Sequence, residues 1–65
     1  MTLEQLSESR RYINSTAFLF VKGEMSGEDI AIAIDYLIDT YKIAESSAIA
    51  RMNERIADMI QGLRS

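Results

Sequence analysis

The chain has 65 residues and a mass of 7.3 kDa, and its ten acidic and seven basic residues give a formal net charge of −3 at pH 7. Cysteine and histidine are both absent, which excludes disulfides, thiolate chemistry, and the commonest metal ligand and general base. An apolar content of 48% with 26% charge excludes an intrinsically disordered chain. A domain this short buries only about 60% of its unfolded surface, so association with a second copy is the stabilising device that the composition leaves.

The sequence carries no signal for membrane insertion or secretion. No uninterrupted apolar stretch exceeds the five residues found at 17–21, whereas a transmembrane helix needs roughly twenty. The first residues, Met1 to Gln5, lack the basic and apolar regions of a secretory signal. We therefore expect a cytoplasmic protein that does not enter a membrane.

A first helix is predicted over about residues 3–22. Thr2 followed three residues later by Gln5 is a capping-box pattern, in which two side chains satisfy unpaired backbone N–H groups. At the other end, Lys22 places a positive charge near the negative end of the helix dipole. Gly23 suits the left-handed position that often follows a helix. The helix is therefore expected to end at Lys22 and to lead into a turn at 23–26.

A second and much longer helix is predicted over about residues 27–61. Ser26 and Asp29 repeat the capping-box pattern at its start. Apolar residues in this segment recur at a spacing of eleven, and at 100° per residue they fall within an arc of about 100°. The rows are Ile30, Tyr41, Met52 and Leu63; Leu37, Ala48 and Met59; Ile38, Ile49 and Ile60; and Ile34, Glu45 and Ile56. An eleven-residue period is close to that of a straight α-helix and favours a single continuous helix.

An alternative interpretation breaks this segment at Ser46-Ser47 and folds a third helix back on the first two. Serine is a modest helix former and a good N-cap, which permits a break. The apolar rows keep their phase across both serines, and we therefore prefer the continuous helix. Three further apolar residues, Ile32, Tyr36 and Ile43, lie opposite the main stripe. A helix packed between the first helix and another copy of the chain would have this pattern.

The unequal lengths of the two helices predict a homodimer. The first helix would span about 30 Å and the second about 50 Å, so the far end of the second would present a bare apolar strip. Soluble monomers rarely expose such a strip, and a second copy would cover it in a two-fold four-helix bundle. The expected interface residues are Ile49, Met52, Ile56, Met59, Ile60 and Leu63. The sequence leaves open whether the long helices run parallel or antiparallel.

Catalytic, metal and cofactor sites are not expected. Asp35 and Asp39 share a helix face, but acid–base catalysis also needs a cleft and a shifted pKa. Glu54 and Asp58 have arginines three residues before them, which predicts surface ion pairs. The acidic run around 24–29 lacks the alternation and final glutamate of a calcium loop. We expect no enzyme, no metal, no cofactor and no small-molecule substrate.

Another protein is the expected partner. Five acids and no base lie between Lys22 and Lys42, so this region predicts a negative patch that suits a basic protein. On the first helix, aromatic and leucine side chains lie off the core stripe, which is the composition of an interaction hot spot. The candidate partner-binding residues are Tyr12, Phe18, Leu19, Glu24, Glu28 and Asp29.

A small dimeric DNA-associated transcriptional regulator is the alternative function. Its candidate contacts with phosphate are Arg10, Arg11, Arg51 and Arg55, repeated by two-fold symmetry in a dimer. The net charge of −3 and the acids near these arginines oppose it.

The sequence thus predicts an all-α helical hairpin, with a short first helix and a long second one, that assembles as a homodimeric four-helix bundle. As a function we expect a non-enzymatic small regulatory or adaptor protein that binds another protein through an apolar and acidic helical surface. Small acidic chains of this kind are typical of bacterial or bacteriophage accessory proteins, which is a statement about genomes rather than about these residues. A purely structural dimerisation module is a third interpretation.

Overall fold

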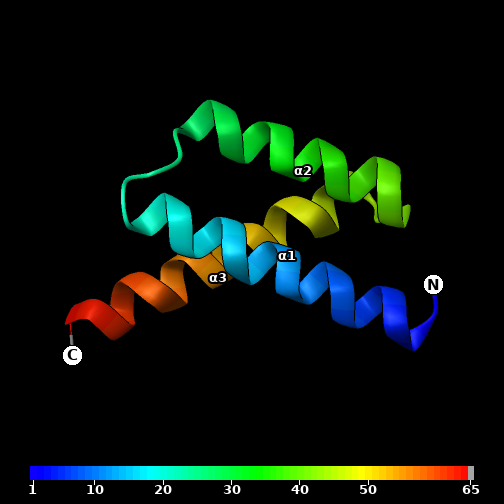
Figure 1. Ribbon diagram of the computed structural model, residues 1–65, viewed down its shortest axis with the longest axis horizontal. Coiled ribbons are helices and arrows are strands. Elements are labelled where there is room, and N and C mark those ends of the chain that lie inside the picture. The colour runs from blue at the N-terminus through cyan, green and yellow to red at the C-terminus, as the bar shows by residue number, and fades with distance from the viewer. Residues whose placement is uncertain (65) are drawn as a thin grey trace.

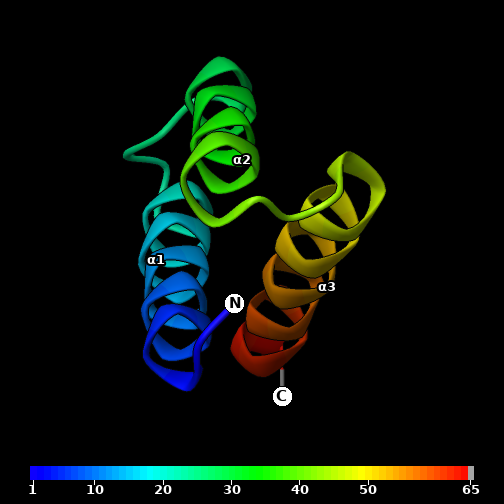
Figure 2. The same cartoon turned by 90° about the vertical axis from the view of Figure 1, so that its right-hand side faces the viewer.

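The chain folds into three helices, and the computed structural model describes residues 1–64. Helix α1 runs Leu3–Val21, α2 runs Gly27–Tyr41 and α3 runs Glu45–Arg64. No strand occurs within the described residues, so the all-α class is confirmed. Figure 1 shows α2 above the other two helices and α3 crossing behind α1, and Figure 2, seen from the side, shows α2 above α1 and α3 beside it. Each helix contacts both of the others.

The capping signals read from the sequence are formed in the structure. The Gln5 backbone N–H donates to the Thr2 hydroxyl at 3.1 Å, and the Thr2 N–H donates to the Gln5 side-chain oxygen at 3.1 Å. Ser26 and Asp29 make the same reciprocal pair at 3.2 and 3.0 Å. Both N-caps have extended backbone angles, and each box satisfies two N–H groups that the helix leaves without a partner.

The turn between α1 and α2 is a Schellman motif, which satisfies the last carbonyls of α1. The Glu24 N–H donates to the Leu19 carbonyl at 2.9 Å, and the Gly23 N–H donates to the Phe20 carbonyl at 3.0 Å. Gly23 has a φ of +84°, a conformation that glycine adopts without a steric penalty. The change of direction at residues 22–26 is therefore specified by residues of the turn itself.

The prediction of one continuous helix over 27–61 is wrong. Helix α2 ends at Tyr41, and α3 begins at Glu45 after three non-helical residues. Lys42 adopts a left-handed conformation with φ 56° and ψ 35°, which turns the chain back toward α1. Ile43 is only 6% exposed and belongs to the hydrophobic core. The break precedes Ser46-Ser47 by a few residues, so the alternative interpretation with a third helix was nearer to the observed fold.

The core explains why the segment breaks although it contains no glycine or proline there. Leu37 of α2 and Ala48 of α3 belong to one eleven-residue row, and both are completely buried, but on separate helices. Met52 is also completely buried, and its sulfur lies 3.5 Å from the Thr16 hydroxyl, which donates to the Tyr12 carbonyl of α1 at 2.9 Å. Folding α3 back buries its stripe within the same chain. This gain outweighs a left-handed lysine, which costs roughly 1 to 2 kcal/mol.

Small side chains let the helices approach closely at the centre of the core. Ala17, Ala33 and Ala48 come from the three different helices and are at most 2% exposed. Ser9 is completely buried, and its hydroxyl donates to the Leu6 carbonyl at 2.8 Å, so its polar atom is satisfied. Close packing of such residues is the means by which a chain of this size forms a core.

The length mismatch that predicted the homodimer is absent from the structure. The three helices have 19, 15 and 20 residues, so none extends far beyond the others as an unsupported arm. Met52, one of the expected interface residues, lies in the core of its own chain. Ile56 and Met59 are partly buried against that core as well. None of the described helices has the length and apolar character required to cross a bilayer.

Candidate functional site

The outer side of α2 is both apolar and acidic. We define the α2 outer face by residues that share one side of this helix and are all exposed: Glu28, Asp29, Ile32, Asp35, Tyr36 and Asp39. Ile32 is 66% exposed and Tyr36 is 45% exposed, which is high for large apolar side chains. The buried side of the same helix carries Ile30, Ala33 and Leu37. Ile32 is therefore not required for packing within the chain, whereas Tyr36 also contacts other aromatic side chains.

Charge is distributed unequally over the three helices. Helix α2 contains four acids and no base, whereas α1 and α3 each contain equal numbers of acids and bases. Lys22 and Glu24, in the first turn, form an ion pair at 4.0 Å and cancel each other. The net negative charge of the molecule is thus concentrated on α2, which makes the α2 outer face attractive to a basic surface.

Tyr36 is held in place by two other tyrosines. Its ring centroid lies 4.7 Å from that of Tyr12 on α1, at an interplanar angle of 40°. The Tyr41 ring meets Tyr36 edge to face at 6.2 Å. Burial raises the pKa of the Tyr12 phenol above its ordinary value, and the neighbouring Tyr36 raises it further. Aromatic contacts of this kind stabilise one orientation of a half-exposed ring.

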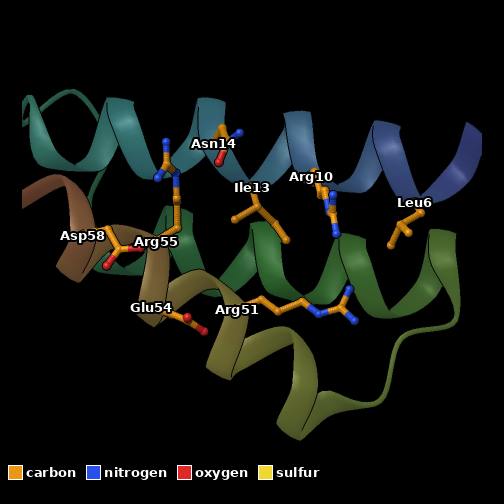
Figure 3. Close-up of a pocket in the computed structure, with 8 residues that line it drawn as sticks. All are labelled: Leu6, Arg10, Ile13, Asn14, Arg51, Glu54, Arg55 and Asp58. Atoms are coloured by element: carbon orange, nitrogen blue, oxygen red, sulfur yellow. The ribbon is translucent and has the colours of Figure 1, made fainter. Parts of the chain in front are cut away.

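The second candidate surface is a groove between α1 and α3, with a volume of about 480 Å³. We call it the α1–α3 groove. Figure 3 shows Arg10 extending from α1 and Arg51 and Arg55 extending from α3 into the space between the two helices. The groove is lined by Leu6, Arg10, Ile13, Asn14, Arg51, Glu54, Arg55 and Asp58.

The ion pairs predicted between the arginines of α3 and the acids three residues on are not formed. Within residues 1–64, neither Arg51 with Glu54 nor Arg55 with Asp58 comes within the 4.0 Å of an ion pair. Exposed pairs of this type contribute only about 0.2 to 0.5 kcal/mol, so solvation and side-chain entropy readily outweigh them. The guanidinium groups are left available to other anions.

The structure brings three of the four arginines proposed for DNA together. Arg10, Arg51 and Arg55 share the α1–α3 groove, while Arg11 is exposed on α1 and does not line it. Glu54 and Asp58 line the same groove. Three members of the predicted basic set therefore line one groove together with two acids, and do not form an extended basic stripe.

The partner-binding candidates divide among separate surfaces. Glu28 and Asp29 belong to the α2 outer face, and Tyr12 supports Tyr36 beside it. Leu19 is partly buried, and Glu24 pairs with Lys22. Phe18 is 52% exposed, with the Lys22 ammonium 5.1 Å from its ring centroid. It borders a smaller apolar pocket of about 270 Å³ between the C-terminal ends of α1 and α3, together with Val21, Lys22, Met59, Gly62 and Leu63.

Ile32 and Tyr36 are the central residues of the α2 outer face, and the interface with a second copy that the sequence predicted for them stays a prediction. Their position opposite the main stripe was visible in the sequence, but it was attributed to a dimer core together with Ile43. The structure separates these residues, because Ile43 enters the core from the connection while Ile32 and Tyr36 stay exposed. Comparisons of the chain with protein-family models, with curated proteins and with solved structures found no match.

Proposed function

We propose that this protein is a non-enzymatic regulatory or adaptor module that binds a basic protein through the α2 outer face. The observation that carries the proposal is the exposure of Ile32 and Tyr36, 66% and 45%, in the middle of an otherwise acidic helix surface. Interfaces concentrate their binding energy in a few apolar or aromatic residues surrounded by polar ones. The α2 outer face has this arrangement on a regular helix.

Preorganisation supports Tyr36 as the principal contact. Its ring is already fixed against Tyr12 and Tyr41 in the free chain, so binding would immobilise little additional side-chain freedom. The acids around it would steer a basic partner toward the surface and would set the orientation of the complex. The partner is expected to carry lysines or arginines around an apolar depression that accepts Ile32 and Tyr36.

Affinity capture with the immobilised full chain tests this function, followed by titration of the captured protein. Ile32→Ala and Tyr36→Ala are each expected to weaken its binding by about thirtyfold, the loss typical of a hot-spot residue. Leu3→Ala is the matched control, because Leu3 is 86% exposed on α1, away from this face. Asp35→Asn combined with Asp39→Asn should slow association and reduce its dependence on salt. Unchanged binding in both single variants contradicts the proposal.

Self-association is a second proposal, and it rests on a smaller surface than the sequence predicted. Ile49 and Ile60 are each 38% exposed and Leu63 is 76% exposed, so these three expected interface residues stay available to a second copy. Sedimentation of the full chain should then give about twice 7.3 kDa, and Ile60→Glu should return it to the monomer with its helices intact. A monomer at all concentrations contradicts dimer formation without affecting the α2 outer face.

The α1–α3 groove is the surface on which the nucleic-acid alternative would depend. Arg10, Arg51 and Arg55 favour contact with phosphate, and Glu54 and Asp58 in the same groove oppose a long polyanion. A gel shift at two salt concentrations distinguishes the functions, because phosphate-driven binding must weaken as salt rises. The concentration of negative charge on α2 favours the protein-binding function.

A further inference from the structure

The α1–α3 groove gathers three positive charges and two negative ones, without an ion pair between them. Arg51 and Arg55 are four residues apart on α3, a spacing at which two positive side chains repel each other. Arg10 adds a third guanidinium from α1. Among the described residues, none of the three forms an ion pair with a carboxylate. Charges arranged in this way are relieved when an anion binds between them.

We infer that the α1–α3 groove binds a small molecule that carries a phosphate group, independently of the α2 outer face. The guanidinium group is planar and presents parallel N–H donors that match two oxygens of one phosphate. In Figure 3, Arg10 of α1 and Arg51 of α3 lie toward the same end of the groove, where they can contact a phosphate from two sides. A volume of about 480 Å³ lies within the range of small-molecule sites in proteins.

The remaining lining residues indicate what else the ligand contains. Leu6 is partly buried and Ile13 is 5% exposed, so both offer apolar contact. Asn14 follows Ile13 on α1 and also lines the groove. Its side-chain amide can both donate and accept hydrogen bonds. In Figure 3 the Arg55 side chain rises from α3 toward α1 where Asn14 lies. A phosphate attached to a flat or apolar body with polar edges, as in a nucleoside monophosphate, would use all of these groups.

The two acids of the groove favour a small ligand over a nucleic acid. Glu54 and Asp58 lie one helical turn apart on α3, alongside the arginines. A continuous phosphate backbone that follows the groove would pass these carboxylates and be repelled, whereas a single phosphate held by Arg10 and Arg51 would not. The overall charge of −3 adds to the repulsion of a polyanion.

Titration of the full chain, followed by the chemical shifts of its backbone amides, tests this inference with adenosine monophosphate as the probe. Inorganic phosphate and adenosine are the separate arms for the two parts of that molecule. Adenosine monophosphate is expected to shift amides around Arg10 to Asn14 and around Arg51 to Asp58, and to bind more tightly than inorganic phosphate. Adenosine alone should bind at least about tenfold more weakly, because it offers the arginines no anion.

Variants of neighbouring arginines provide the control. Arg51→Gln and Arg10→Gln should each weaken binding about tenfold, since each removes a charge-assisted hydrogen bond. Arg11→Gln removes the same charge one residue away, outside the groove, and should change the affinity less than twofold. Arg51→Lys keeps the charge but loses the two-donor geometry. Its loss of affinity should lie between that of Arg11→Gln and that of Arg51→Gln. Helix content measured by circular dichroism confirms that each variant is folded.

Three results would overturn the inference. An equal loss of affinity in Arg11→Gln and Arg51→Gln would mean that the probe responds only to overall charge. Shifts confined to other parts of the chain would place the anion elsewhere. Saturation by a short DNA duplex at lower concentration than adenosine monophosphate, with Arg11 contributing as much as Arg51, would assign the arginines to nucleic acid instead.

Discussion

The two connections of this molecule reverse the chain by different physical means. The first, between α1 and α2, has a glycine with φ +84°, a Schellman pair of hydrogen bonds and a serine capping box. The second, between α2 and α3, has a left-handed lysine and an alanine whose carbonyl accepts the Ala48 N–H at 2.9 Å. Local chemistry specifies the first turn, and burial specifies the second. The position of a turn without glycine or proline can therefore be set by the burial of side chains from the helix that follows it.

The buried anchor of the second connection is Ile43, and its removal should have the largest effect on stability. Ile43→Ala should lower the free energy of unfolding by about 2 to 5 kcal/mol, the usual loss for a buried isoleucine. Total stability scales as roughly 0.05 to 0.15 kcal/mol per residue, so a chain of this size would lose most of it. Urea unfolding followed by circular dichroism measures the change.

Ile32→Ala is the matched control for this experiment. Both isoleucines would lie on the same outer side of a continuous helix, but Ile43 is 6% exposed and Ile32 is 66% exposed in the structure. The exposed substitution should change stability by no more than about 0.5 kcal/mol. Equal effects of the two substitutions would contradict the observed break and favour the continuous helix.

The first connection should depend on its glycine. Gly23→Ala places a Cβ at φ +84°, where nothing lies within 4 Å of the new atom, so the loss comes from backbone strain alone. We expect the free energy of unfolding to fall by about 1 to 2 kcal/mol. Thermal unfolding measures it. Gly27→Ala, also in open space but at the start of a helix, serves as control and should not destabilise the chain.

The serine cap that follows should contribute less. Ser26→Ala removes the acceptor of the Asp29 N–H and is expected to lower stability by about 1 kcal/mol, while Ser26→Asn should retain most of it. Urea midpoints of the two variants give the difference. A loss as large in Ser26→Asn as in Ser26→Ala would show that the capping hydrogen bond is not the source of the effect.

Features of the fold that depend on neighbouring residues could be predicted from the sequence. The first helix, both capping boxes and the left-handed Gly23 followed from the sequence, because each depends on residues within one turn of it. The break at Lys42 did not, since its cause is the burial of side chains distant in sequence. The one local sign was Ile43, an apolar residue out of phase with the helix stripe, and it was interpreted as part of a dimer interface.

The candidate sites follow the same division. The acidity of α2 is a property of one segment, so it could be predicted from the sequence. The protein partner that an acidic surface suits stays a prediction. The α1–α3 groove was not predicted as a unit. With a continuous second helix, Arg10 near the start of the chain and Arg51 near its end would lie far apart. Only the return of α3 along α1 places their side chains in one groove.

The smallest effect is expected from adding a capping residue at the start of α3, where the sequence has none. Ala44 precedes α3 and has no side-chain acceptor for the N–H groups of its first turn. Ala44→Ser should raise the free energy of unfolding by about 0.5 to 1 kcal/mol by supplying one. The gain is smaller than the loss from Ser26→Ala, because Ser47, three residues on, is not the glutamate or glutamine of a capping box.

The direction of that change decides what holds α3 in place. Ala44→Val is the control, since valine at this position supplies no acceptor for the hydrogen bond and is as poor an N-cap as alanine. If burial has already fixed the start of α3 at Glu45, serine stabilises the native turn without changing the structure, and the amide shifts of α2 stay as they were. If serine instead lowers stability, the backbone at Ala44 is not in the extended conformation of an N-cap, and α3 is positioned by its core contacts alone.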